Sequence, residues 1–214
     1  MKKYIFAVFI ALLSLPVIAQ QQLRAKIVFD NATEAFQKAN GIKVDFMLKV
    51  MTNGHLQGSE NGTIMLNGDK FMLKTSEMTT WFDGKTQWSY ITRNDEVNVS
   101  NPTSDELQQI NPYSFLYIGK RNYNYQLGST NVFQGKPIWE VILTSKNKKV
   151  EFDHIVLYVT KNTYEPLYIK LRQRGQNTFT EITVTHYQKG LQYANSTFVF
   201  NKKNHQTAEI IDLR

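Results

Sequence analysis

The sequence has 214 residues, with 25 Lys and Arg against 18 Asp and Glu, and it contains no cysteine. The length fits one domain with a substantial core, and the missing cysteine excludes a disulfide framework, so the fold must rest on that core. The two short basic clusters at 146–149 and 201–203 are typical of solvated loop tips, not of a nucleic-acid surface.

Residues 1–19 have the three parts of a signal peptide: a start with two lysines, an apolar stretch, and a break that ends at Ala19. The apolar stretch is shorter than the ~20 residues that span a bilayer, so an uncleaved anchor is the less favoured alternative. We predict export, cleavage after Ala19, and one mature domain over residues 20–214. Its net charge is +5, because 23 basic residues then face 18 acidic ones.

The first part of the mature chain changes from helical to strand periodicity. Arg24–Asn40 has apolar residues at helical spacing and ends at the stop signal Asn40-Gly41. From Ile42 to Met51 the period is two, and Asn53-Gly54 marks a hairpin turn. The sequence then predicts a meander of short antiparallel strands, separated by turns, over 63–66, 70–75, 78–82, 86–91 and 96–100.

The strand pattern breaks at residues 101–118. Cap residues and acids at 101–106 precede an apolar and aromatic stretch, which predicts one or two short helical turns. Further strands are predicted at Tyr123–Leu127, Pro137–Thr144, His154–Val159, Leu167–Arg172, Thr178–Tyr187 and Thr197–Phe200, before a polar tail. The pattern therefore indicates a single antiparallel sheet, long enough to curl, with helices at its start and middle.

Enzymatic motifs are missing from the sequence. The four histidines have no second ligand at i, i+4 spacing, and there is no Gly-x-Ser-x-Gly elbow, phosphate-binding glycine loop or cysteine nucleophile. The residues therefore do not indicate catalysis and disfavour a metal site, but catalytic groups can assemble from distant positions, so an enzyme is not excluded at this point. Aromatic residues on many strands favour either an ordinary core with a covering helix or a ligand cavity inside a curved sheet.

Several segments together resemble the family of outer-membrane lipoprotein carrier proteins (LolA). Gly58-x-x-x-Gly62-x-Ile64-x-Leu66 followed by Lys70-Phe71 looks like its second and third strands, and Asp83-Gly84-Lys85-x-x-Trp88-x-Tyr90 is similar to its most recognisable hairpin. Ser196–Phe200 looks like its closing Phe-x-Phe strand. The resemblance covers nearly the whole mature chain.

The resemblance implies a mainly β (α+β) fold, in which one antiparallel sheet curls into an incomplete, half-open β-barrel with a helical lid. It also implies a soluble periplasmic carrier that is not an enzyme, has no catalytic residues, metal or cofactor, and binds the acyl chains of lipoproteins or other lipids. Partners would be an inner-membrane release complex and an outer-membrane receptor, and the carrier would be a monomer. The missing cysteine selects the carrier over the lipid-anchored receptor. Where well-studied members have a basic residue and proline after the second strand, this chain has Asn67-Gly68-Asp69.

An acyl chain of 16 carbons in water costs on the order of 10 kcal/mol, at about 0.8 kcal/mol per CH₂, so a carrier must offer comparable apolar burial. The predicted lipid-binding cavity is lined by Val44, Phe46, Leu48, Ile64, Leu66, Phe71, Trp81, Trp88, Tyr90 and Trp139. The predicted lid side chains, which would fill the empty cavity, are Leu107, Ile110, Phe115, Leu116 and Ile118. A register error of one residue would move all the predicted cavity side chains of a strand to the opposite face of the sheet.

Two other classes of protein stay open on sequence grounds. One is an exported sensor or scaffold with the same fold, which binds lipid only to regulate a partner. The other, less favoured, is an envelope lipid-processing enzyme, which would need polar groups converging in the cavity.

Overall fold

The computed structural model describes residues 2–111, 113, 116, 123–146 and 152–214. It contains a long helix, α1 (Lys2–Lys38), and a short one, α2 (Ser104–Ile110). The helix predicted over Arg24–Asn40 is the last part of α1, which ends just before Gly41 with its φ of 63°. Among the described residues, no helix combines the length and the apolarity that a membrane span requires.

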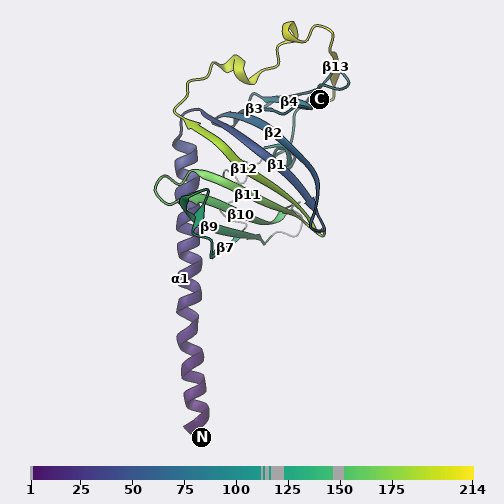
Figure 1. The fold of residues 1–214 in the computed structure, drawn as a ribbon. Coiled ribbons are helices and arrows are strands. Elements are labelled where there is room, and N and C mark those ends of the chain that lie inside the picture. Colours follow the sequence, from purple (N-terminus) through teal and green to yellow (C-terminus); the bar gives the residue numbers. More distant parts are fainter. Residues whose placement is uncertain (1, 112, 114–115, 117–122, 147–151) are drawn as a thin grey trace.

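The described strands belong to one large sheet (Figure 1). In chain order they are β1 (Ile42–Thr52), β2 (His55–Asn67), β3 (Lys70–Lys74), β4 (Met78–Phe82), β5 (Gln87–Ile91), β6 (Glu96–Ser100), β7 (Tyr123–Leu127), β8 (Val132–Phe133), β9 (Lys136–Ser145), β10 (Phe152–Thr160), β11 (Pro166–Gln173), β12 (Thr178–Lys189) and β13 (Glu209–Asp212). The spatial order is β13-β6-β5-β4-β3-β2-β1-β12-β11-β10-β9-β7, and β8 pairs with β9.

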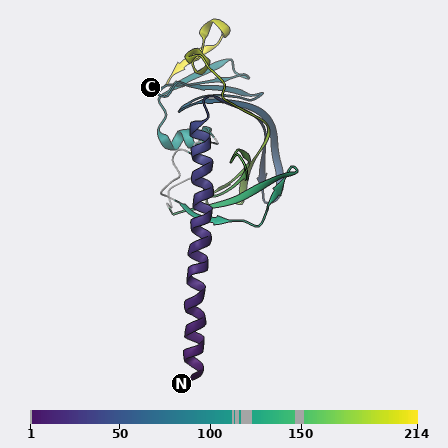
Figure 2. The same cartoon turned by 90° about the vertical axis from the view of Figure 1, so that its left-hand side faces the viewer.

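The sheet is curled but not closed. The antiparallel pairing of β1 with β12 joins the N-terminal strands to the C-terminal ones, while β13 and β7 form the two edges. Seen in profile, the sheet curves from β3–β6 to β9, and α2 lies on its open side (Figure 2). The predicted fold class, a single curled sheet that forms an incomplete barrel with helices beside it, is confirmed.

The main core lies on the concave side of this sheet. Alternate side chains such as Val44, Ile64 and Leu157 point to that side and are fully buried. One side of α1 packs on them through Phe29 and Phe36, and α1 contacts β7 and β9. The helix thus shields the concave face near the β7 edge.

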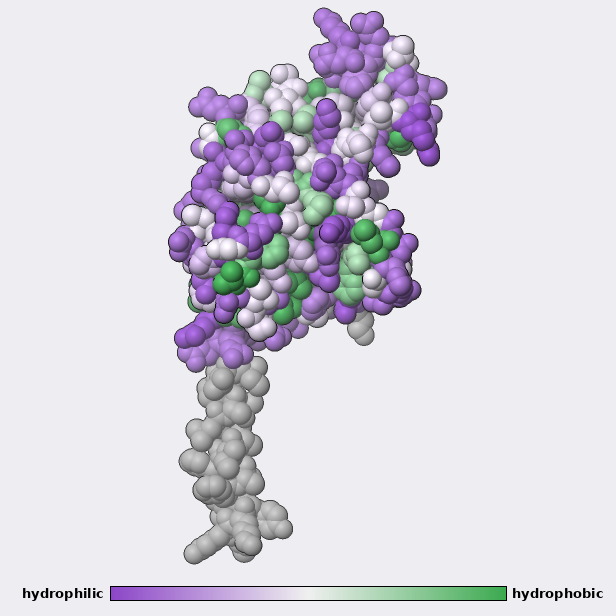
Figure 3. Space-filling view, viewed as in Figure 1, coloured by the Kyte–Doolittle hydropathy of each residue, from purple (hydrophilic) through white to green (hydrophobic). Residues whose placement is uncertain are grey.

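The convex face is mixed in character (Figure 3), with hydrophobic residues scattered among hydrophilic ones. Here Lys170 pairs with Glu181 at 2.9 Å and Arg172 with Asp153 at 2.8 Å. The hydrogen bond from Arg172 holds the pKa of Asp153 below its usual value. The cross-strand ion pairs fit a solvated sheet surface.

The C-terminal strap (residues 191–214) differs from its prediction. The extended piece predicted at Thr197–Phe200 is instead the short 3-10 helix η2 (Asn195–Phe198), followed by η3 (Lys202–Asn204). The predicted polar tail contains β13, which pairs with β6 in parallel. Its Ile210 and Ile211 supply apolar residues that a tail prediction overlooks.

Candidate binding cavity

The concave face brings most of the predicted cavity residues together. Seven of the ten lie in or against the main core: Val44, Phe46, Leu48, Ile64, Leu66, Phe71 and Trp139. The ring of Phe46 lies over Gly62, where a Cβ would come within 2.4 Å of Phe46 Cζ. The glycine motif in β2 therefore makes room for an aromatic ring on the cavity face.

The other three predicted cavity residues, Trp81, Trp88 and Tyr90, lie on the convex face. Trp81 pairs with Trp88 across β4 and β5, whereas the neighbouring Phe82 faces the main core. The three rings lie under the strap, where Trp81 is 5.6 Å from Phe200 between ring centroids. This placement corrects the prediction. Both faces of β4 and β5 carry large apolar residues, so alternation alone does not say which face is inward.

The lid segment (residues 103–116) begins as the cap residues predict. Thr103 is the N-cap of α2, and its side chain and that of Glu106 form a reciprocal capping box. Leu107 and Ile110 pack half-buried against the main core, and Leu116 is buried in it. The two remaining predicted lid residues, Phe115 and Ile118, lie outside the described residues.

Tyr113 is a lid residue that sequence reasoning did not single out. It is fully buried, and its ring stacks on Phe36 of α1 with centroids 5.2 Å apart and an interplanar angle of 13°. Its hydroxyl has no hydrogen-bond partner among the described residues, and burial raises its pKa. The backbone N–H of Tyr113 donates to Asn111 Oδ1 at 2.9 Å, which fixes the turn that inserts the ring.

An opening into the core lies where α1 passes into β1. This pocket of about 220 Å³ is lined by Phe36, Gln37, Ala39, Ile42, Leu66, Gly68 and Asp69. It is smaller than the roughly 300–1,000 Å³ of typical ligand pockets, so a long ligand would have to displace neighbouring side chains. Part of its rim is formed by Gly68 and Asp69, in the turn between β2 and β3.

No group of His, Asp and Glu side chains in the described part of the chain could hold a metal ion. His154 lies on the convex side of β10, and burial followed by the charge of Arg172 lowers its pKa. The concave face offers apolar contact and a few neutral polar groups.

A half-barrel with an apolar concave face, covered by helices, defines a class of carrier and binding proteins. Residues 15–176 match the family model described as "Outer membrane lipoprotein carrier protein LolA". The match spans about three-quarters of the sequence, and the chain belongs to this family. Members of the family are carriers or binding proteins.

The chain is similar to several solved structures. An uncharacterised conserved protein from Thermus thermophilus is 10% identical with a TM-score of 0.60, and the alignment covers 88% of this chain and 99% of that one. A LolA superfamily protein from Nitrosomonas europaea is also 10% identical, with a TM-score of 0.45 and coverage of 82% and 97%. No curated protein matches the sequence at a significant level.

Proposed function

We propose that the chain is a periplasmic carrier that binds the acyl chains of lipoproteins in its concave cavity and moves them from the inner to the outer membrane. The observation that carries this proposal is the cover of the apolar concave face, where Tyr113 and Leu116 fill space between the sheet and α1. Such side chains can leave as an acyl chain enters. The family to which the chain belongs supports the same activity.

The buried hydroxyl of Tyr113 favours the exchange of the lid contacts for contacts with an acyl chain. An unpaired buried polar group costs about 1–3 kcal/mol, so the closed lid gives up part of the stability that its apolar burial provides. When the lid opens, this hydroxyl regains hydrogen bonds to water while an acyl chain replaces the apolar contacts. A carrier needs such a balance, because binding that is too strong prevents delivery.

The remaining parts of the proposal concern location and partners. Cleavage after Ala19 would leave a mature chain that starts at Gln20, ahead of the part of α1 that packs on the core. An inner-membrane release complex would load this chain, and an outer-membrane receptor would unload it. Both steps need only binding and no covalent chemistry.

The direct experiment is to express the full-length chain in a bacterium with two membranes, purify it from the periplasm, and analyse bound molecules by mass spectrometry. We expect a mature N-terminus at Gln20 and co-purified acylated lipoproteins. Recovery of one partner protein without any acyl chain would favour a sensor. A protein retained in the cytoplasm, or one that never takes up acyl chains, would contradict the proposal.

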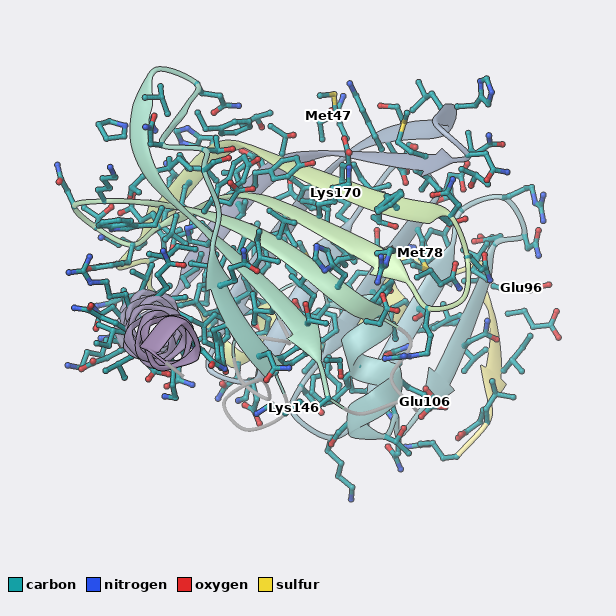
Figure 4. The ribbon with its side chains drawn as sticks, turned by 90° about the horizontal axis from the view of Figure 1, so that it is seen from below. Met47, Met78, Glu96, Glu106, Lys146 and Lys170 are labelled. Carbon is teal, nitrogen blue, oxygen red and sulfur yellow. The ribbon has the colours of Figure 1, made fainter. Side chains whose placement is uncertain are left out.

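A pair of neighbouring substitutions in β1 tests the cavity itself. Leu48 packs against the main core, whereas Met47 points away from it on the convex side (Figure 4). Leu48→Trp should fill the cavity and lower the affinity for a fluorescent acyl probe about tenfold or more, since bulk replaces the space for several CH₂ groups. Met47→Trp, the matched control, should bind as the wild type does. Equal affinities of all three proteins would place the acyl site elsewhere.

A further inference from the structure

A polar patch interrupts the apolar concave face. It consists of Thr80 of β4 and of Gln87 and Ser89 of β5. Thr80 pairs with Ser89 and Phe82 with Gln87, so all three residues point to the same side as Phe82, which belongs to the main core. On this side of the sheet, α2 lies beside the strands that carry Met78 and Glu96 (Figures 2 and 4).

Two of the three patch residues are buried, Ser89 is half-buried, and the hydrogen bonding of the patch is incomplete. Thr80 is fully buried and Gln87 is only 8% exposed. Gln87 Nε2 donates to Ser89 Oγ at 3.0 Å, and the hydroxyls of Thr80 and Ser89 share one hydrogen bond of 3.2 Å. Gln87 Oε1 has no partner among the described residues. The acceptor Gln87 Oε1 is thus unused. The hydroxyls of Thr80 and Ser89 have two hydrogens but use only one in their shared hydrogen bond, so one hydrogen can still be donated.

A buried amide oxygen without a donor costs free energy that a bound ligand can recover. The complementary ligand group must present an N–H or O–H to Gln87 and an acceptor to the Thr80–Ser89 pair. A secondary amide carries both on adjacent atoms. The described residues that face this side from β4, β5 and β6 include no lysine or arginine and one acid, Glu96, so a phosphate would find no counter-charge.

The patch also leads directly into the apolar core. Thr80 lies beside Leu73 in β3, Leu73 beside Ile64 in β2, and Ile64 beside Val44 in β1. Leu73, Ile64 and Val44 are buried in the main core. A ligand with its amide at Gln87 could therefore extend a hydrocarbon chain across three strands without meeting another polar side chain in this row.

We infer that the patch of Thr80, Gln87 and Ser89 binds the amide of an N-acyl group. Gln87 Oε1 accepts the amide N–H, a hydroxyl of the Thr80–Ser89 pair donates to the acyl carbonyl, and the acyl chain runs toward β1. This inference rests on the proposed function and specifies it. The cavity prefers cargo that has an amide-linked acyl chain over cargo that has only ester-linked acyl chains.

The test uses two ligands that differ in one atom: N-hexadecanoylglycine methyl ester, and the hexadecanoyl ester of methyl glycolate, in which oxygen replaces N–H. Each competes with a fluorescent acyl probe for the mature protein. We expect the wild type to bind the amide about tenfold more tightly, the value of one typical buried hydrogen bond. Gln87→Met, similar in shape but without the amide, should abolish this preference.

Gln126→Met is the matched control, because Gln126 is an exposed glutamine on β7, and it should keep the preference of the wild type. Equal binding of both ligands by the wild type, or a preference that survives Gln87→Met in a protein with native circular dichroism, would overturn the inference and leave the carrier proposal standing. Failure of the wild type to bind either ligand would overturn both.

Discussion

Two segments cover the sheet, and they are held in different ways. The lid segment lies on the concave side and the strap on the convex side. The strap is fixed through the backbone: β13 pairs with β6, Glu209 N–H donates to Asp95 O at 2.9 Å, and Leu213 N–H to Val99 O at 2.8 Å. In the lid segment, the backbone hydrogen bonds of the described residues are all local, as from Leu107 to Thr103 and from Leu116 to Tyr113.

This difference is the one we expect between a permanent cover and a removable one. Backbone pairing is directional and must be broken as a set, whereas side-chain burial can be exchanged for another apolar surface. Under the strap, the ring of His205 lies 4.3 Å from that of Tyr90 and 5.4 Å from that of Phe200, between centroids. In the lid segment, Tyr113 is buried, and its hydroxyl has no hydrogen-bond partner in the part of the chain that the structure describes. We therefore expect substitutions in the strap to change stability and substitutions in the lid to change binding.

The largest effect is expected at Gly41, where the strap's first residue meets the end of α1. Its φ is 63°, Leu191 N–H donates to its carbonyl at 3.1 Å, and an added Cβ would lie 1.8 Å from Leu191 O. Gly41→Ala combines a strained backbone with a clash against backbone, so the free energy of unfolding should fall by about 4 kcal/mol. Urea denaturation of the wild type and of Gly41→Ala measures this loss of stability.

Gly54→Ala is the control for Gly41, because Gly54 also has a positive φ of 79° but nothing lies within 4 Å of its added Cβ. It should cost only about 1 kcal/mol from the backbone conformation. If the two variants were equally stable, the junction between α1 and the strap would not be a constraint on the fold.

The next effect tests whether the strap is structural. Phe198 of η2 is fully buried, with its ring 5.6 Å from that of Tyr193. Phe198→Ala should lower the free energy of unfolding by about 3 kcal/mol, because a large cavity replaces the ring. Val199→Ala, at a neighbouring exposed position, should change it by less than about 0.5 kcal/mol. The affinity for an acyl probe should be unchanged in both, and a loss of affinity in folded Phe198→Ala would contradict the division between strap and lid.

At the lid segment we expect a substitution to raise the free energy of unfolding, not to lower it. Tyr113→Phe removes the unpaired hydroxyl and keeps the stacked ring, so the free energy of unfolding should rise by about 1–2 kcal/mol. The closed lid is stabilised by the same amount, so the affinity for an acyl probe should fall by about 5- to 30-fold. Tyr193→Phe is the control, because the Tyr193 hydroxyl donates to Ile42 O at 3.4 Å and its removal should not stabilise. A less stable Tyr113→Phe would show that the hydroxyl is satisfied in solution.

How far the sequence predicts this molecule depends on how local each signal is. The turn at Asn53-Gly54 is fully predictable, since both residues have positive φ, as two-residue hairpin turns require. The cap at Thr103 is equally local, because its partner Glu106 is three residues away. Such features depend on neighbours in the chain and on no distant contact.

The features that escaped prediction depend on distant contacts. β13 is a four-residue strand whose partner β6 lies about a hundred positions earlier, and its parallel pairing leaves no turn signal. The first half of β2 is polar and exposed, so it lacks the alternation that marks a strand. The rings of Trp81 and Trp88 face outward because the strap covers them, and only the fold reveals that cover.

The smallest expected effect lies outside both covers, at His154 on the convex side of β10. Burial, and then the charge of Arg172, lower its pKa in the folded state below the unfolded value of about 6.5. Above that pH both states are neutral and stability does not change; as the pH falls through it, the unfolded state takes up a proton that the folded state resists. Stability should therefore decline with acidity until the lower folded pKa is passed.

His154→Gln should remove this contribution to the slope of the free energy of unfolding against pH, measured by urea denaturation between about pH 7 and 5. The affinity for an acyl probe should stay that of the wild type. An unchanged slope would assign the acid sensitivity to other groups, and a change in affinity would show that the convex sheet surface and the lid are coupled.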